Sequence, residues 1–553
     1  MKCLLRPLPL PFHLPLNITT VIHITALRLY SSTMARTYES ALAHLDSIQS
    51  NRAVTSLFSP PASVSVSASV SASSPSAKDL NALAIPEMLS WLARAGLAQD
   101  DLARLRCIHV AGTKGKGSVC AYLTSVLTRV PAAVGRVGTY TSPHLVSVRE
   151  RIQLDGRPIS RELFARYFFE VWDALTEAAR DEAARSGNKN VSAAEVEGPA
   201  SKPFYFRFLT ILAFHVFLRE GVKSAVVECG IGGEYDSTNV LPAEAVTASV
   251  ISQLGIDHVG MLGGTLPEIA WNKAGVMKPG RKCFTRKLRG GEGEEEAMRV
   301  LRERAAEKKA TLIEVEDQEV ERWGGVRRTE TGSLEGEFQR YNQALALKAA
   351  AEHLRVLDGS QHVPAEETLS DLAERFSDGL RQAKLQGRSE TRHYGDFTWL
   401  VDGAHTAESL QVAAKWFAGK RKASAGDAKV VLLFNQQERD VAKLLESLHG
   451  GIERELGAAQ GNFFDYAIFA RNDVRRKTAD EPERDLAVQQ AAADAMRELS
   501  PRTETAVVGS VDEAVEKIQA AQRRDGGKVV VLATGSFHLV GALLRILEPD
   551  AEL

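Results

Sequence analysis

Short apolar runs alternate with longer amphipathic segments along most of the 553 residues. The runs have the length of buried strands, and the amphipathic segments repeat their apolar residues with the period of a helix. The pattern predicts strands at Cys107–Val110, Ser224–Glu228, Val246–Ser252, Thr398–Val401, Lys429–Phe434, Tyr466–Ala470 and Val529–Ala533. It predicts helices at Tyr38–Ile48, Phe204–Arg219, Tyr341–Leu357 and Ser370–Leu385. Strands that alternate with helices favour an α/β fold, with parallel sheets covered on both faces.

The chain is longer than one hydrophobic core usually serves, so we expect more than one domain. A boundary near Gln386–Arg388 separates a large N-terminal α/β domain, 34–385, from a smaller C-terminal α/β domain, 388–553. Polar stretches near 57–78 and 180–202 are predicted surface insertions. Shorter insertions are predicted at Arg289–Glu296, Ala423–Gly426 and Arg475–Glu483.

Charge and cysteine content exclude several classes of protein. The 68 Lys and Arg residues against 70 Asp and Glu give a net charge of −2, which argues against a nucleic-acid-binding protein. The five cysteines are scattered and form no CxxC pair, so we expect neither a disulfide framework nor a zinc site. A local basic pocket for a small anionic substrate stays compatible with this composition.

The segment Gly112–Ser118, Gly-Thr-Lys-Gly-Lys-Gly-Ser, follows one predicted strand and precedes a helix. A glycine-rich loop at a helix N-terminus lets backbone N–H groups converge on phosphate oxygens. Lys116 adds a mobile positive charge, and Ser118 adds a hydroxyl within reach of a magnesium ion. The loop departs from the standard P-loop, because Val110 stands at the first glycine position and Gly117 separates Lys116 from Ser118. The alternative is a structural turn that binds no ligand.

Residues with a candidate chemical role also lie at or after the ends of other predicted strands. Glu228 closes a buried strand, at the sheet edge where α/β proteins bind ligands, so it is a candidate magnesium ligand. The alternative is an acid that pairs with a nearby base. His258 follows another strand, beside Asp257, and Lys273 lies in a predicted helix further on. In most proteins these two would be an ordinary loop histidine and a solvated lysine.

Taken together, the motifs resemble those of folylpolyglutamate synthases, a branch of the Mur-ligase-like ATP-dependent amide ligases. They occur in the family's order and spacing at Gly112–Ser118, Thr141–Leu145, Glu228–Gly233, Leu254–His258, Ile269–Lys278, Asp402–Thr406 and Thr534–His538. The resemblance runs from about Tyr38 to Leu547. Asp402–Ser409 and Leu432–Asn435 are more similar to eukaryotic, fungal-like members than to bacterial ones.

The resemblance implies a P-loop-type ATPase domain followed by a Rossmann-like C-terminal domain. It also implies roles for individual residues. ATP contacts fall on Thr113, Lys114, Gly115, Lys116, Gly117, Ser118, Asn342, Arg388 and Asp402. Magnesium ligands fall on Ser142, Glu228 and His258, and contacts to the incoming glutamate fall on Ser536 and His538. Catalytic roles fall on Lys116, on His405 near the nucleotide, and on Lys273, which matches a lysine that is carbamylated in related ligases.

The activity that the resemblance implies is ligation of L-glutamate to the γ-carboxylate of a folate, with ATP, Mg²⁺ and a monovalent cation such as K⁺. Two alternatives remain open. One is dihydrofolate synthase, alone or combined with the first activity, and the other is an ATP-binding homologue without catalysis. Such a homologue would be expected to lose Lys116, Glu228, His258 or Lys273, and all four are present. We expect a monomer that binds small molecules and has no transmembrane segment.

The N-terminus predicts a targeting segment. Residues 1–33 contain no Asp or Glu and end in Arg28–Thr33, which is typical of an acid-poor organelle presequence. Met34 follows directly and offers a second start. We therefore expect a mitochondrial form that begins at Met1 and a cytoplasmic form that begins at Met34. The alternatives are a leader without function and a chain whose true start is Met34.

Overall fold

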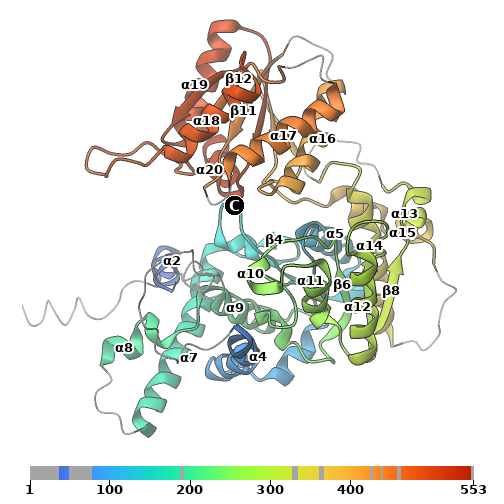
Figure 1. Ribbon diagram of the computed structural model, residues 1–553. Helices are drawn as coiled ribbons and strands as arrows, with labels where there is room; N and C mark the ends of the chain where they lie inside the picture. The colour runs from blue at the N-terminus through green and yellow to red at the C-terminus, as the bar shows by residue number, and fades with distance from the viewer. Residues whose placement is uncertain are drawn as a thin grey trace, which may run out of the picture.

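The computed structural model describes residues 36–48, 77–186, 192–326, 334–359, 367–423, 428–437, 440–457 and 462–549. Its strands form two sheets, and each sheet is covered by helices on both faces (Figure 1). The predicted presequence and nearly all of the predicted insertion at 57–78 lie outside the described residues. Within the described ranges, no helix has both the length and the apolar character needed to cross a bilayer.

The N-terminal sheet has the strand order β4-β3-β2-β5-β1-β6-β7-β8. Its strands are β1 Cys107–Ala111, β2 Val137–Tyr140, β3 Ile152–Leu154, β4 Arg157–Pro158, β5 Ser224–Glu228, β6 Val246–Ile251, β7 Lys282–Arg286 and β8 Thr311–Val315. The strands from β2 to β8 in this order run parallel, and β3 and β4 extend the edge in antiparallel pairing. Both β1 and β5 are buried along their whole length.

Two groups of helices enclose this sheet in apolar clusters. The first group packs its aromatic side chains over one face and consists of α2 Tyr38–Ser47, α4 Ala77–Arg94, α7 Arg161–Ser186 and α9 Tyr205–Arg219. The second group covers the other face and consists of α5 Lys116–Leu127, α14 Gln339–Asp358 and α15 Leu369–Gln382. The remaining helices of this half are α6 Pro131–Val134, α8 Ala193–Glu197, α10 Val259–Leu262, α11 Leu266–Lys273, α12 Glu294–Glu307 and α13 Asp317–Trp323.

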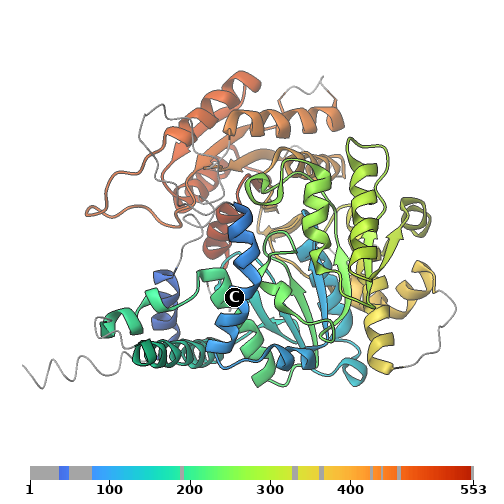
Figure 2. The ribbon, with the colours of Figure 1, turned by 60° about the horizontal axis from the view of Figure 1, so that its bottom comes forward.

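The C-terminal sheet has the order β13-β12-β11-β14-β10-β9, and only β9 is antiparallel. Its strands are β9 Glu390–Tyr394, β10 Phe397–Val401, β11 Lys429–Phe434, β12 Tyr466–Ala470, β13 Glu504–Val508 and β14 Val529–Thr534. One face carries α16 Ala407–Ala423, α17 Val441–Leu456 and α18 Ala487–Leu499. The other face carries α19 Val511–Asp525 and α20 Phe537–Leu547 (Figures 1 and 2).

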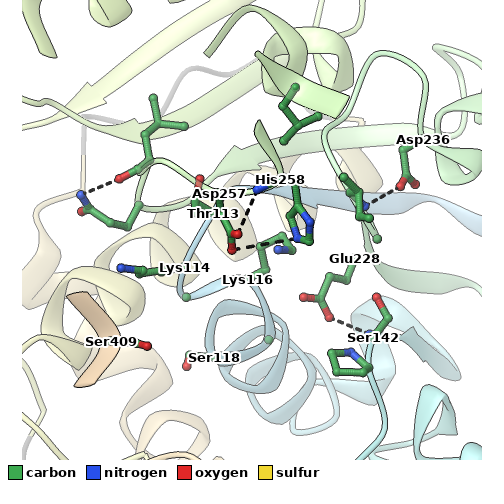
Figure 3. A pocket seen from close by; sticks show the side chains of 18 of the residues that line it. Thr113, Lys114, Lys116, Ser118, Ser142, Glu228, Asp236, Asp257, His258 and Ser409 are labelled. Carbon is green, nitrogen blue, oxygen red and sulfur yellow. Dashed lines mark hydrogen bonds and ion pairs between the residues drawn. The ribbon is translucent and has the colours of Figure 1, made fainter. Parts of the chain in front are cut away.

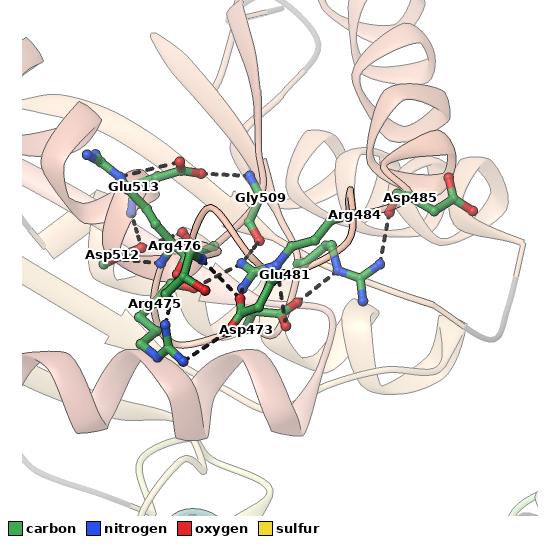
Figure 4. A network of polar contacts seen from close by, with 12 residues as sticks. Asp473, Arg475, Arg476, Glu481, Arg484, Asp485, Gly509, Asp512 and Glu513 are labelled. Atoms are coloured by element: carbon green, nitrogen blue, oxygen red, sulfur yellow. Dashed lines mark hydrogen bonds and ion pairs between the residues drawn. The ribbon is translucent and has the colours of Figure 1, made fainter.

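The predicted insertions differ in structure. Within 180–202, α7 continues to Ser186 and α8 follows, so much of this polar stretch is helical. The segment Arg475–Glu483 is a loop that ion pairs hold in place (Figure 4). Arg475 pairs with Glu481 at 3.0 Å, and Arg484 donates to the Gly509 carbonyl at 2.8 Å. Ion pairs and hydrogen bonds of arginine side chains therefore stabilise this loop.

Candidate active site

The glycine-rich loop Gly112–Ser118 joins the end of β1 to α5. Gly115, which precedes the helix, has a left-handed φ of +84°. Gly112 has φ +145°, and a Cβ added there would meet the hydroxyl oxygen of Ser252 at 1.9 Å. Both positions therefore require the conformational freedom and the small size of glycine.

The N–H groups of this loop form two sets. Those of Thr113 and Lys114 donate to the Gln253 carbonyl, at 2.9 and 3.1 Å, and hold the loop against the segment after β6. The bond from the Val119 N–H to the Gly115 carbonyl begins α5, so the N–H groups of 116–118 lie at the open helix end. An anion is stabilised there by the helix dipole. A phosphate group would therefore meet residues 116–118 first.

Two lysines converge on one carbonyl beneath the loop. Lys116 Nζ donates to the Gly112 carbonyl at 3.1 Å, and Lys273 Nζ donates to the same oxygen at 2.8 Å. Lys273 is 2% exposed. Burial, and then the charge of Lys116, lower the pKa of Lys273 to about 7. Lowering the pKa favours the neutral amine, which is the form that reacts with CO₂ to give a carbamate.

Glu228, the last residue of β5, lies beside Lys116 in a buried position (Figure 3). One of its carboxylate oxygens accepts a hydrogen bond from the Ser142 N–H at 3.0 Å. Burial raises the pKa of Glu228, although the positive charge of Lys116 opposes the rise. A carboxylate in this state would be stabilised by a further cation.

His258 reaches the same space from the loop after β6 (Figure 3). It has a left-handed φ of +50° and directly precedes α10. Its N–H donates to the Asp257 carboxylate at 2.9 Å, and its Nε2 lies 4.0 Å from the other Asp257 oxygen. Its side chain is 47% exposed, so His258 is far more accessible than Glu228.

The C-terminal domain contributes Asp402, which follows β10 directly. The buried Asp402 carboxylate accepts hydrogen bonds from the Ser389 N–H at 2.7 Å, the Ser389 hydroxyl at 3.1 Å and the Ala404 N–H at 2.9 Å. Burial raises the pKa of Asp402, and the charge of Arg388 opposes the rise. The Arg388 guanidinium also lies 4.6 Å from the ring centroid of Phe537.

A cavity of about 1030 Å³ collects most of the predicted residues. Its lining combines both domains and includes Thr113, Lys114, Gly115, Lys116, Gly117, Ser118, Ser142, Glu228, His258, Asn342, Arg388, Asp402 and His405. Residues far apart in sequence therefore face one space. His405 is oriented by its Nδ1, which lies 2.8 Å from the Gly403 carbonyl and must carry the proton, because a carbonyl only accepts.

Three predicted residues lie outside this lining. Lys273 sits behind Gly112, as described above. Ser536 precedes α20, and its hydroxyl accepts a hydrogen bond from the Leu539 N–H at 3.3 Å. His538 lies near the partly buried His144, whose pKa falls to about 3 through desolvation and neighbouring positive charge. The roles expected for Ser536 and His538 stay predictions.

Arg286 and Glu408 are among the lining residues that sequence reasoning did not name. Arg286, the last residue of β7, forms two hydrogen bonds of 2.6 Å to Asp317 and lies 4.0 Å from the ring centroid of Tyr341. The strand-end rule would have found Arg286 if β7 had been predicted. Glu408, at the start of α16, forms an ion pair with Lys114 across the two domains. Sequence gives no signal for that contact.

The donor set fits a magnesium ion that keeps several non-protein ligands. Within the described residues, no group of three or more His, Cys, Asp and Glu side chains is placed to enclose a metal ion. The cavity does present the Glu228 carboxylate and the hydroxyls of Ser142 and Ser118. Mg²⁺ prefers oxygen ligands, and it is commonly held by one or two carboxylates with water and substrate phosphates. The chemistry of the site is therefore compatible with Mg²⁺.

Comparison with known proteins identifies the family. No family model matches the chain. The folylpolyglutamate synthase of Neurospora crassa is 38% identical over 575 aligned residues, which cover 99% of each chain. The Saccharomyces cerevisiae (strain FostersO) enzyme is 36% identical over 527 residues, which cover 93% of this chain and 88% of that one. The chain belongs to the folylpolyglutamate synthase family.

A solved folylpolyglutamate synthase has the same fold. The Mycobacterium tuberculosis enzyme, determined with ADP and AMPPCP, matches with a TM-score of 0.59 at 24% identity. The match covers 85% of this chain and 98% of that one. The predicted α/β class, with two α/β domains in the manner of folylpolyglutamate synthases, is confirmed.

Proposed function

We propose that this protein is an ATP-dependent ligase that joins L-glutamate to the γ-carboxylate of tetrahydrofolate and of its polyglutamates. One observation carries the proposal beyond family membership. A glycine loop with Lys116 and the buried acid Glu228 line a single cavity, and that cavity also contains residues of the second domain. A site that must bring ATP, a carboxylate and an amine together needs both parts.

The reaction needs an activated carboxylate, because the leaving group of a free carboxylate would be oxide. A folate carboxylate oxygen attacks the γ-phosphorus of ATP, which gives an acyl phosphate and ADP. The glutamate amine then attacks the acyl carbon, and phosphate leaves as the amide forms. The Lys116 ammonium and the N–H groups of 116–118 stabilise negative charge on the transferred phosphoryl group. Exclusion of water between the domains protects the acyl phosphate from hydrolysis.

Ser142, Glu228 and His258 are the residues that we propose to hold Mg²⁺. The ion would neutralise charge on the phosphate oxygens. The preference of Mg²⁺ for oxygen makes His258 the weakest of the three ligands. A monovalent cation such as K⁺ completes the expected set of ions. The lowered pKa of Lys273 supports carbamylation of that residue, which would reverse its charge.

The remaining residues are proposed to contact either the nucleotide or the incoming glutamate. Asn342, Arg388 and Asp402 would bind the nucleotide, and His405 would lie near it; all four line the cavity. Ser536 and His538 would lie near the incoming glutamate. Residues of both domains of one chain line the cavity, which is compatible with the monomer that we propose.

Assays of the purified protein with ATP and L-glutamate test the proposal. We expect glutamyl product with tetrahydrofolate as acceptor, and one ADP for each glutamate added. Product from dihydropteroate alone would instead assign a dihydrofolate synthase, and product from both acceptors would assign a bifunctional enzyme. ATP binding without ADP formation from either acceptor would indicate a non-catalytic homologue.

We propose that the protein serves both mitochondrion and cytoplasm. The support is the acid-free leader 1–33 and the start at Met34. The negative charges of polyglutamate tails hinder passage through membranes, so each compartment has reason to hold its own enzyme. A fluorescent reporter fused to residues 1–33 should enter mitochondria. A reporter that stays in the cytosol would show that the leader does not target the protein.

A further inference from the structure

The segment Ser142–Ser147 connects the candidate active site to the C-terminal domain. At its start, the Ser142 N–H donates to Glu228. A few residues later, Leu145 packs in the apolar cluster formed by Trp399, Val401, Val540 and other buried residues of the C-terminal domain. The Val146 carbonyl accepts a hydrogen bond from Arg545 in α20. One short segment therefore contacts Glu228, a predicted magnesium ligand, and also α20, the helix that Ser536 caps and that contains His538.

The contact between this segment and α20 is close. A Cβ added at Gly541 would meet the Leu145 carbonyl oxygen at 2.1 Å. Gly387, in the connection between the domains, also lies against Leu145, and its added Cβ would meet the Leu145 Cδ2 at 3.0 Å. Since atoms cannot approach to 2.1 Å without displacement, α20 can hold this position only with glycine at 541.

Glu150 holds the segment in shape from the N-terminal side. Its carboxylate accepts hydrogen bonds from the N–H groups of Leu145 and Val146, both at 2.8 Å, and also from the Ser147 N–H. The Ser147 contact alone would be an ordinary capping box at the start of the short helix Val148–Arg151. The two further amides belong to the residues that contact the C-terminal domain, so Glu150 does more than cap a helix.

We propose that Glu150 is a positioning residue that couples domain docking to the ligation step. By fixing three successive N–H groups, it sets where Leu145 meets α20 and, through the same backbone, where Ser142 meets Glu228. Lys116 and Glu228, which are proposed to act at the phosphoryl group, belong to the N-terminal domain, whereas Ser536 and His538, which are proposed to lie near glutamate, are the cap and the first turn of α20, so the docking of α20 bears most directly on attack by glutamate. Loss of Glu150 should therefore allow water to hydrolyse part of the acyl phosphate to phosphate and the free folate carboxylate before glutamate forms the amide. This inference rests on the proposed function.

Glu150→Gln tests the proposal, with Glu195→Gln as the matched control. Glu195 is the corresponding acid of a capping box at helix α8, and it does not line the cavity. In Glu150→Gln, one of the two carboxylate oxygens becomes an NH₂ group that cannot accept. We expect glutamate incorporation to fall about 10-fold or more, because small displacements of reacting groups have large effects on rate. We expect phosphate released per glutamate added to rise, and the dissociation constant for ATP to change less than about 2-fold.

A purely structural role predicts a different result. A partly unfolded Glu150→Gln sample would lose phosphate release and glutamate incorporation in equal proportion. A ratio equal to that of the wild-type protein and of Glu195→Gln would therefore overturn the proposal. Gly541→Ala provides a second test that leaves Glu150 untouched. Alanine favours helix more than glycine does, so a raised ratio in this variant would come from displaced docking.

Amide hydrogen exchange separates this inference from the proposed function, because it needs no ligation. In Glu150→Gln, exchange should accelerate at 145–147 and also in α20. Acceleration confined to 145–147 would contradict the coupling, even if the wild-type protein ligates glutamate. If the wild-type protein forms no glutamyl product, the proposed function fails, and the exchange pattern still decides whether Glu150 fixes the docking of α20.

Discussion

Two buried carboxylates occupy corresponding places in the two domains and are held in opposite ways. Glu228 ends β5, and Asp402 directly follows β10, so each lies at the carboxyl end of a parallel strand. Asp402 accepts three hydrogen bonds from its own domain. Glu228 accepts one, from Ser142. Since a carboxylate has about four acceptor sites, Glu228 keeps most of its capacity for a ligand.

The positive charges nearby show the same difference. On the N-terminal side, Lys116 and Lys273 crowd one carbonyl, which does not neutralise them. On the C-terminal side, Arg388 lies close to Asp402 and packs on Phe537. At the first sheet edge two lysines share one neutral acceptor beside a carboxylate with open acceptor sites, whereas at the second edge the hydrogen bonds of its own domain satisfy the carboxylate. Substitutions at the first edge should affect turnover, and those at the second edge should affect stability.

Lys116→Ala should have the largest effect and should nearly abolish ligation. Lys116 stands at the open end of α5, where it can act on the phosphoryl group in the transition state. Loss of one such charged donor should lower kcat by about 10² to 10³-fold. The midpoint of thermal unfolding should stay at the wild-type value, because the Lys116 ammonium shares its single carbonyl partner with Lys273. Near-normal turnover in a folded variant would remove the phosphate-loop assignment.

Glu228→Gln should lower kcat by about 10²-fold, since it removes a proposed magnesium ligand and its negative charge. It should not destabilise the ligand-free protein. Burial raises the pKa of Glu228 in the folded state, so the group favours folding at low pH and loses that contribution as the pH rises through its folded pKa. Unfolding measured across pH should therefore show a stability advantage of the variant that grows as the pH rises. A variant that is less stable than wild type at neutral pH would contradict this account.

Lys273→Ala should lower activity by about 10 to 10²-fold if the side chain acts as a carbamate that supports the metal site. A short carboxylic acid added to the assay should restore part of the activity by replacing the lost negative charge. Full activity without rescue would end the carbamate hypothesis. Mass spectrometry of the native protein under CO₂ gives an independent measurement of the modification.

Asp402→Asn should act mainly on stability. The amide places an NH₂ group where Ser389 or Ala404 now donates, so one buried donor loses its acceptor. Such a loss costs about 1 to 3 kcal/mol, which denaturant unfolding measures directly. Turnover at saturating ATP should change only a few-fold in the folded fraction. A normal unfolding midpoint combined with a large rise in KM for ATP would show instead that Asp402 acts chiefly on the nucleotide.

The elements of the fold were largely predictable because buried strands are continuous apolar runs. The predicted bounds of β5, β11 and β12 match those of the structure. The partly exposed strands β7 and β8 were missed. The reason is physical: Lys282 and Arg286 lie at the ends of β7 and face partly to solvent, so the short apolar centre gives too weak a signal.

Residue chemistry alone pointed to the glycine loop and the strand-end Glu228 as parts of the candidate site. Ser142, Asn342 and Asp402 were expected only from the resemblance to the family, and they also line the cavity. The three hydrogen bonds of Asp402, the amides around Glu150 and the shared carbonyl of Lys116 and Lys273 depend on backbone geometry that distant segments create together. No local pattern in the sequence encodes those partners.

Glu408→Gln should have the smallest effect on the protein. It tests the ion pair that links the two domains between the two sheet edges. Glu408 pairs with Lys114 across the domains, and the side chains are 57% and 29% exposed. Pairs this accessible contribute about 0 to 1 kcal/mol, because solvent screens them. Without Glu408, the Lys114 ammonium loses its ion-pair partner and can interact with the ATP phosphates instead, so the dissociation constant for ATP should fall by less than about 3-fold at low ionic strength. The difference should vanish at about 1 M salt, where the Debye length is near 3 Å.

Titration calorimetry at both ionic strengths measures the change in the dissociation constant for ATP. Weaker ATP binding at low salt would show that Glu408 supports the nucleotide site, and the contrast between the two sheet edges would then be less complete than the carboxylates suggest.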